Sequence, residues 1–299
     1  MNNTLIAKIS SFTLESRKKL EKEASEQLEG LYGWLPDGTF ADASFYPAVA
    51  TLPEARSVRG ALEEHSLASE QAGTAPKDAR KELVRETAFT WLNRFVALRM
   101  MEERGLVKTT LSKHHNSAGF LFWVAEEGNE REYELQQAGE SPLDAAGEGP
   151  RHVAYRRFLL GRCADLSNEL PVLFDTSDLP SRLFPRPVAL LEFLESMNEK
   201  TLAEAWRKGN EETVGWVYQS FISEEKKRIF DDFSRGGKAF AEDIGPATQI
   251  FTPEWIVRYL IESSLGNLWM EIHPDSVLKD KLSRSVFSPN PSRRPLKLA

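Results

Sequence analysis

Apolar residues recur at every third or fourth position along much of the chain, and this spacing is typical of one face of an α-helix. It predicts a first amphipathic helix over residues 13–31 and a second from Pro53 to about residue 69. Glycines and a proline in the stretch 32–44 indicate a turn between them. The chain therefore opens with two helices joined by an irregular connection.

The most apolar helix is predicted for residues 77–104, directly after Pro76, a residue that suits the first turn of a helix. Large apolar side chains occupy so many of its positions that most of its surface should be buried. Its middle also contains Asn93, Arg94 and Arg99, and a buried arginine needs an ion-pair partner. The acidic partners expected for these side chains are Glu86, Glu102 and Glu103.

The remaining patterns are also mostly helical. Residues 120–124 fit either a short strand or the edge of a helix, whereas a clear helix is predicted for residues 152–170. Prolines and aspartates in the stretch 171–187 favour irregular structure and a domain hinge. Further helices are predicted over residues 188–197, 201–206, 211–220 and 224–233. We therefore expect an N-terminal helical domain over residues 1–170 and a second helical region over residues 171–245.

The composition is that of a globular protein, because 41% of the 299 residues are hydrophobic and 28% are charged. A chain of this length fits one large or two small domains. The sequence has no run of about 18 apolar residues and no signal peptide at residues 1–16, so we expect a cytoplasmic protein without membrane contact. The single cysteine, Cys163, cannot form an internal disulfide and is interpreted as a packed thiol.

The net charge of −7 argues against a surface coated with basic residues, but the charge is unevenly distributed. Residues 125–149 are acidic, whereas residues 283–299 contain basic residues and no acidic one. Nucleic acids bind mainly through Lys and Arg at their phosphates, so any DNA contact would have to use one part of the chain.

Two other patterns carry weaker chemical signals. His114 and His115 are adjacent, and neighbours in sequence rarely bind the same metal ion. No third ligand is patterned nearby, so a solvated loop is the preferred interpretation and no metal site is predicted.

The second pattern is Glu224-Glu225-Lys226, which has the Glu-x-Lys spacing of some nucleases, with Asp175 upstream. The triplet begins a predicted helix rather than a strand. The preferred interpretation is an exposed helix face on which Glu224 pairs with Arg228.

The segment around residues 246–265 has the strongest local signals for a functional helix. Thr252 is predicted as the N-cap and Pro253 as the first helical residue, and Glu254 complements the positive end of the helix dipole. An apolar face follows, and Gly266 is expected to end the helix. The first-turn N–H groups of such a helix can hold an anion, for example a ligand carboxylate.

Three stretches carry a resemblance to a known enzyme family. They are residues 90–102, the Gly-Trp-Val-Tyr-Gln of residues 215–219, and the Gln-Ile-Phe-Thr-Pro of residues 249–253, which an amphipathic helix and residues 264–269 follow. Together they resemble the adenine-specific (N6) DNA methyltransferases of the PglX type in BREX phage-defence systems, and related restriction-modification methyltransferases.

The resemblance implies a mainly α-helical region that leads into a Rossmann-like methyltransferase domain absent from this sequence. It implies S-adenosylmethionine as cofactor, with DNA and other phage-defence proteins as partners of the complete enzyme. Residues 246–275 would lead into the cofactor-binding domain, and residues 276–299 would be a basic, proline-rich tail. The residues implied to form part of the cofactor site are Gln249, Phe251, Thr252 and Pro253.

Two motifs that such enzymes require are missing from the sequence. One is an Asp-Pro-x-x-Gly-x-Gly-type loop for the cofactor, and the other is an Asn-Pro-Pro-Tyr-type tetrapeptide that holds a flipped-out adenine. Asn290-Pro291 lacks the second proline and the aromatic residue. We therefore expect no catalytic residues in this chain, and a truncated or frameshifted enzyme that is inactive alone.

Two alternatives of other classes stay open. One is a stand-alone helical DNA- or protein-binding module derived from such an enzyme. The other is the nuclease portion of a fused restriction-modification enzyme.

Overall fold

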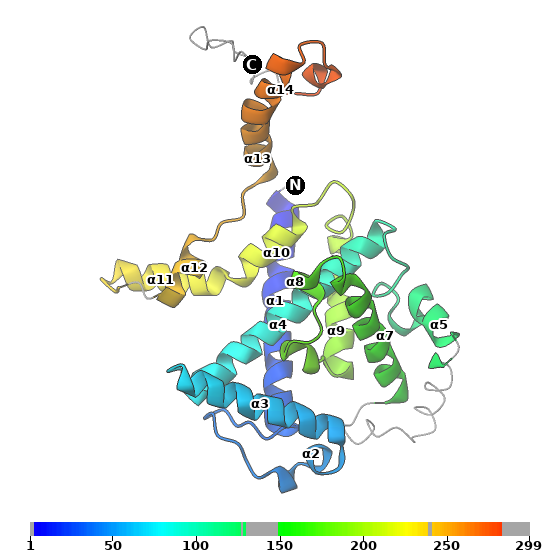
Figure 1. Cartoon of the computed structure of the whole chain (residues 1–299), viewed down its shortest axis with the longest axis vertical. Helices are drawn as coiled ribbons and strands as arrows, with labels where there is room; N and C mark the ends of the chain where they lie inside the picture. Colours follow the sequence, from blue (N-terminus) through cyan, green and yellow to red (C-terminus); the bar gives the residue numbers. More distant parts are fainter. Residues whose placement is uncertain (1–2, 127, 130–148, 239–240, 283–299) are drawn as a thin grey trace. The chain divides into compact units, whose positions relative to one another are not determined.

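The computed structural model describes residues 3–126, 128–129, 149–238 and 241–282 (Figure 1). Helices dominate, and among these residues the only β-type pairing is an isolated bridge between Trp34 and Phe40. The predicted mainly α-helical fold is therefore confirmed. The chain divides into two compact units, Met1–Ala247 and Thr248–Ala299.

The first unit is built on long helices joined by short ones. Many of them begin at a proline, whose missing N–H would have no partner in the first turn of a helix. The long helices are α1 (Asn3–Gly30), α3 (Pro53–Gln71), α4 (Pro76–Glu103), α7 (Pro150–Ser167), α9 (Pro187–Met197), α10 (Thr213–Phe221) and α11 (Ser223–Ser234). The short ones are α2 (Pro47–Thr51), α5 (Ala118–Val124), α8 (Pro171–Phe174) and α12 (Ala241–Thr248).

Most predicted helices are confirmed, with three differences. The first helix begins at Asn3 rather than near residue 13. Residues 120–124, left open between strand and helix, lie in α5. Residues 201–206 were predicted as a helix, and this is wrong, because only a short 3-10 turn, Lys200–Leu202, forms at that place. No helix in the described part of the chain is long and apolar enough to cross a membrane.

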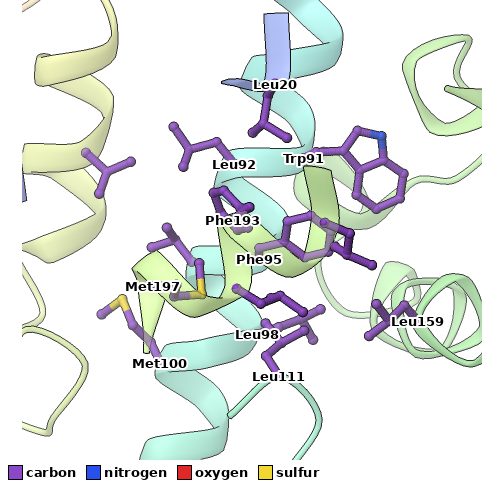
Figure 2. Close-up of a cluster of buried hydrophobic side chains, with 14 of the residues drawn as sticks. Leu20, Trp91, Leu92, Phe95, Leu98, Met100, Leu111, Leu159, Phe193 and Met197 are labelled. Atoms are coloured by element: carbon purple, nitrogen blue, oxygen red, sulfur yellow. The ribbon is translucent and has the colours of Figure 1, made fainter. Parts of the chain in front are cut away.

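The main core forms where α4 packs against α1 and α10, and where α9 packs against α1. Figure 2 shows Trp91 and Phe95 of α4 close to Phe193 of α9 within this cluster. The rings of Phe95 and Phe193 lie 5.3 Å apart, and both side chains are fully buried. Aromatic side chains contribute strongly to core stability because each buries a large apolar area.

This core draws residues from both sides of the boundary predicted at residues 170 and 171, from Leu5 to Ile222. Cys163 lies inside it, fully buried, and burial raises the pKa of its thiol to about 11. The interpretation of Cys163 as a packed thiol is confirmed. The separation of residues 1–170 from residues 171–245 stays a prediction.

A second apolar cluster lies where the end of α1 meets α3 and the connection before α2. Trp34 is fully buried, stacks on Phe40 at 5.0 Å, and donates a hydrogen bond from its indole N–H to the Gly38 carbonyl at 3.1 Å. Gly38 has a φ of +92°, and a Cβ there would lie 2.4 Å from the Lys77 nitrogen. Only glycine fits this turn, which accords with the turn predicted from glycine and proline.

One of the two buried arginines in the middle of α4 has a different partner from those expected. Arg94 is only 2% exposed and pairs with Asp178 at 3.2 Å, and its guanidinium also donates to the Ser181 hydroxyl at 2.6 Å. Its partners therefore come from the connection after α8, and not from the glutamates of α4. Arg99 does pair with one of the three expected glutamates, Glu103, at 3.0 Å.

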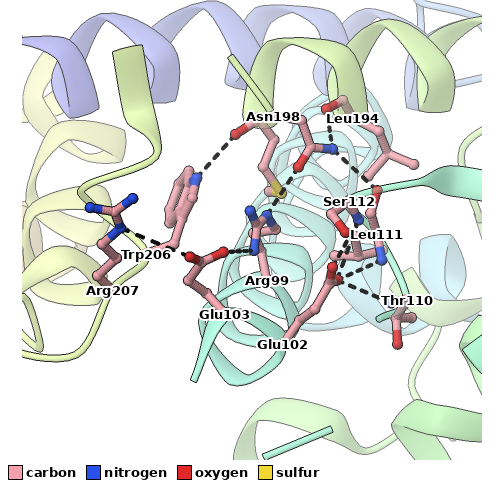
Figure 3. A network of polar contacts seen from close by, with 11 residues as sticks. Arg99, Glu102, Glu103, Thr110, Leu111, Ser112, Leu194, Asn198, Trp206 and Arg207 are labelled. Carbon is pink, nitrogen blue, oxygen red and sulfur yellow. Dashed lines mark hydrogen bonds and ion pairs between the residues drawn. The ribbon is translucent and has the colours of Figure 1, made fainter. Parts of the chain in front are cut away.

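Glu102 has a structural role that its position in the sequence did not reveal (Figure 3). Its carboxylate accepts hydrogen bonds from the backbone N–H groups of Thr110, Leu111 and Ser112, at 3.1, 2.8 and 3.2 Å. Hydrogen bonds to an ionised acceptor are stronger than neutral ones. Glu102 thereby fixes the loop that follows α4 against the end of that helix.

Candidate functional site

The segment singled out by the sequence forms the second unit. It contains α13 (Glu254–Ile261), a π-helical turn (Glu262–Gly266, η6), α14 (Asn267–Ile272) and a 3-10 turn (Val277–Asp280, η7). The first three elements follow one another without a break. The expectation that Gly266 ends the helix is therefore wrong.

Gly266 lies inside this helical stretch. Its φ is −61°, a right-handed helical value, so no special backbone conformation requires a glycine. It is buried, and a Cβ there would lie 3.4 Å from the Leu282 side chain, which is an ordinary contact distance. Neither the backbone nor the packing of Leu282 therefore requires a glycine at this position.

The four residues implied to contact the cofactor lie just before α13. Gln249 and Thr252 are exposed, whereas Phe251 and Pro253 are half-buried. Pro253, rather than the predicted Thr252, is the N-cap, and no side chain caps the helix. The helix therefore starts one residue later than predicted, and the role of these four residues in cofactor binding stays a prediction.

One ion pair holds the elements of this unit together. The guanidinium of Arg258 on α13 lies 2.7 Å from the carboxylate of Glu262 in the π-helical turn, and Glu262 is buried. Hydrogen bonding to Glu262 raises the pKa of Arg258. Arg258 also donates to the Lys281 carbonyl at 3.4 Å, so it connects α13 to the end of the unit.

The helices α13 and α14 expose large apolar side chains that no other part of their own unit buries. No residue of either helix is buried. Trp255 is 70% exposed and Leu265 is 64% exposed. The other exposed large apolar residues of the second unit are Ile250, Val257, Tyr259, Leu260, Ile261, Leu268, Trp269, Ile272 and Val277. Large apolar side chains are more often buried than exposed in a folded protein, so their number here is unusual.

The other candidate patterns have structural explanations. His115 packs on Tyr155 with ring centres 4.8 Å apart, which is inconsistent with a fully solvated loop. His114 has a φ of +49°, and burial lowers its pKa. The described residues contain no group of three or more His, Cys, Asp or Glu that could hold a metal ion.

The nuclease-like triplet lies at the start of α11. Glu225 forms an ion pair with Arg17, which is itself buried, and lies 3.4 Å from Arg85. Glu224 lies 3.9 Å from Lys18, and the predicted pairing of Glu224 with Arg228 does not form. Arg228 is instead paired with Asp232 and Asp243. These contacts hold α11 to α1 and give the triplet a structural role.

Two of the three stretches that carry the family resemblance lie in the main core. Residues 90–102 belong to α4, and residues 215–219 belong to α10, where Val217 is fully buried. Trp216 and Tyr218 pack against the core from the same helix. The third stretch, residues 249–253, precedes α13 in the second unit and is exposed or half-buried.

Two known proteins are similar to a large part of this chain. No protein-family model matches the sequence. The adenine-specific methyltransferase BrxX of Escherichia coli O9:H4 (strain HS) is 34% identical over 209 residues, which cover 67% of this chain. The adenine-specific methyltransferase PglX of Lacticaseibacillus casei (strain Zhang) is 30% identical over 212 residues, or 66% of this chain.

This chain is a homologue of BrxX and PglX. The predicted resemblance to PglX-type methyltransferases is confirmed. The matching regions make up 16% of BrxX and 17% of PglX, so the chain spans about a sixth of the length of these relatives.

Proposed function

We propose that this chain forms the region of a site-specific adenine-N6 DNA methyltransferase, in phage defence or restriction-modification, that leads into the cofactor-binding domain. The observation that carries this proposal is the similarity of two thirds of the chain to BrxX and PglX. In the complete enzyme, DNA would be the substrate and S-adenosylmethionine the methyl donor. Other phage-defence proteins would be its partners.

The proposed contacts to S-adenosylmethionine come from Gln249, Phe251, Thr252 and Pro253. The start of α13 fits one edge of such a cofactor, because no side chain caps the helix and an anion is favoured at the positive end of its dipole. The half-buried ring of Phe251 offers an apolar surface beside it. When bound, the cofactor supplies the methyl group, and these residues would only help to orient it.

The apolar surface of α13 and α14 supports the same proposal. The helical stretch that contains α13 and α14 exposes large apolar side chains to water, so cover by another folded domain would stabilise it. We propose that a Rossmann-like cofactor-binding domain provides this cover. Because the sequence lacks the glycine-rich loop and the Asn-Pro-Pro-Tyr-type tetrapeptide, the 299-residue chain alone should not methylate DNA.

A chimera tests this proposal. The region of BrxX that matches this chain would be replaced by residues 3–282, and adenine methylation of host DNA would be measured by sequencing that detects the modified base. We expect methylation by the chimera and none by the isolated chain. Thr252→Ala and Phe251→Ala in the chimera should reduce methylation, whereas Val277→Ala, which also truncates an exposed side chain in the same unit, should not.

A chimera that folds and leaves the DNA unmethylated would contradict the proposal. It would favour the stand-alone binding module, a role consistent with the first unit having a core of its own. Metal-dependent DNA cleavage that Glu224→Ala abolishes would favour the nuclease portion instead.

A further inference from the structure

Two consecutive helices of the first unit, α10 and α11, meet at a break of a single residue. Ile222 is both the C-cap of α10 and the N-cap of α11. The guanidinium of Arg17 on α1 donates a hydrogen bond to the carbonyl of Phe221, the last residue of α10. In an unbroken helix that carbonyl would accept from a backbone N–H four residues later, so its bond to Arg17 favours a change of direction here.

Arg17 also holds the first turn of α11. Its guanidinium donates to both carboxylate oxygens of Glu225, to one of them at 2.8 Å, and lies 4.7 Å from the centre of the Phe221 ring. Two-point contact between an arginine and a carboxylate fixes their relative orientation as well as their distance. Arg85 of α4 approaches the same carboxylate at 3.4 Å. Glu225 thus connects α11 to both α1 and α4.

The two partners of this ion pair are charged and mostly enclosed. Arg17 is 7% exposed, and the side chain of Glu225 is 15% exposed. Burial acts to raise the pKa of Glu225, but the hydrogen bonds from Arg17 hold it below its ordinary value. Enclosed charges are screened less by water and salt than surface charges, so this pair fixes α11 more firmly than an exposed pair would.

Apolar packing holds α11 much less than it holds α10. The nine residues of α10 include four buried ones, Thr213, Val217, Ser220 and Phe221. Among the twelve residues of α11, all within the described part of the chain, Ile229 alone is buried, and Phe230 is 51% exposed. The direction of α11 therefore depends strongly on the polar contacts of Glu225.

The helix α12 is attached to α11, and the cofactor segment follows it directly. Arg228 of α11 lies 3.2 Å from the carboxylate of Asp243 on α12. The last residue of α12 is Thr248, and the next residue is Gln249, the first of the four implied to contact the cofactor. We call α11 and α12 together the arm. The backbone passes from the main core through the arm into the cofactor segment.

We propose that the ion pair between Arg17 and Glu225 is a latch that sets the direction of the arm, and that it thereby positions the cofactor segment in the complete enzyme. Ile222 is the hinge, because residues between two elements absorb the backbone change when one element moves. Arg17 and Glu225 are positioning residues and contact neither cofactor nor DNA. Their effect on the cofactor segment rests on the proposed function, whereas the latch rests on the contacts of the arm.

The first test measures the direction of the arm in the complete 299-residue chain. Spin labels are attached at Lys8→Cys on α1 and Asp231→Cys on α11, both exposed positions, and pulsed electron paramagnetic resonance gives the distribution of distances between them. Cys163 is fully buried, so it should not take up the label. Glu225→Lys should broaden this distribution about twofold or more, because it replaces an attraction to Arg17 by a repulsion.

The matched control is Glu224→Lys, which makes the same change of charge one residue earlier on the same helix. Glu224 is 52% exposed on its side chain and lies 3.9 Å from Lys18, so its pairing is weak and the distribution should stay unchanged. In Glu225→Lys the charge of Arg17 is still compensated by Glu21, which lies 2.7 Å away. Thermal unfolding followed by circular dichroism establishes that both variants are folded.

A milder variant keeps the test usable if the charge reversal prevents folding. Glu225→Gln removes the charge without reversing it, so it should broaden the distribution less than Glu225→Lys and more than Glu224→Lys.

The second test uses the BrxX chimera and varies the concentration of S-adenosylmethionine. Glu225→Lys should raise the KM for S-adenosylmethionine about tenfold and change kcat little, because it misplaces a binding segment and not the reacting groups. A mere loss of folded protein would lower the rate at every cofactor concentration and leave KM unchanged. Glu224→Lys should leave both constants unchanged.

Three results would overturn the proposal. They are an equally narrow distance distribution in the folded Glu225 variants, equal broadening by Glu224→Lys, and an unchanged KM in the Glu225→Lys chimera. A chimera that does not methylate at all, while Glu225→Lys still broadens the distribution in the 299-residue chain, would overturn only the proposed function.

Discussion

The two units of the molecule use apolar side chains in opposite ways. In the first unit, Trp91 and Phe95 of α4 are fully enclosed by helices that lie far away in the sequence. In the second, Trp255 and Leu265 also lie on a helical stretch rich in apolar residues, and they remain more than half exposed. Helical periodicity thus predicts an apolar face, but it does not tell whether the same unit provides the cover.

The largest effect should come from truncating the core of the first unit. Trp91→Ala should lower the free energy of unfolding by about 3–5 kcal/mol, because it removes a buried aromatic side chain and leaves a cavity. Urea denaturation followed by tryptophan fluorescence and circular dichroism measures this change. A loss below about 1 kcal/mol would show that the core of α4 is not the main source of stability.

The second-largest loss of stability should come from removing the buried charge of Arg94 on α4. Arg94→Met should lower the stability by about 3 kcal/mol, because it leaves the hydrogen-bond partners of the guanidinium unpaired in the interior. Lys279→Met in the second unit removes a charge from an exposed residue, so its effect should be far smaller. If urea denaturation shows equal losses of unfolding free energy for the two variants, this difference between the units is contradicted.

A smaller effect should appear as the pH falls. The pKa of His152 is about 4 in the folded chain and 6.5 is the ordinary value, so folding disfavours its charged form. Stability should be complete above pH 6.5 and decrease as the pH drops from 6.5 towards 4, by on the order of 1–2 kcal/mol at pH 5.

The measurement compares urea midpoints at pH 7 and pH 5 for the unmodified chain and for His152→Phe, which fills a similar volume without a titrating group. The variant should lose less stability over this range. If the variant and the unmodified chain lose the same stability between pH 7 and pH 5, His152 is not the source of the loss.

The smallest change in stability is expected in the second unit. Trp255→Gln/Leu265→Gln should change the free energy of unfolding by less than about 0.5 kcal/mol, because both side chains are exposed. The same variant should bind less of a dye that fluoresces on apolar surfaces. A marked loss of stability would mean that these side chains are buried in solution and would reject the contrast between the units.

Some elements of this protein could be predicted from local sequence, and others could not. The helices around Pro53, Pro76 and Pro187 could be predicted because proline and apolar spacing act locally. Residues 201–206 could not, since their short apolar pattern is satisfied by insertion of Leu202 and Trp206 into the core rather than by a helix. The candidate cofactor residues came from family resemblance, and no local pattern of spacing or charge would have singled them out.

The sequence by itself determined that the chain is helical, which positions are apolar, and that it is related to PglX-type methyltransferases. These properties depend on residues within a few turns of one another or on similarity along the chain. Only the tertiary structure decided that Arg94 pairs with Asp178, that Glu102 binds the loop after α4, and that α13 and α14 are left uncovered in their own unit. The reason is that burial and ion pairing depend on side chains brought together from distant parts of the chain, and local spacing carries no information about them.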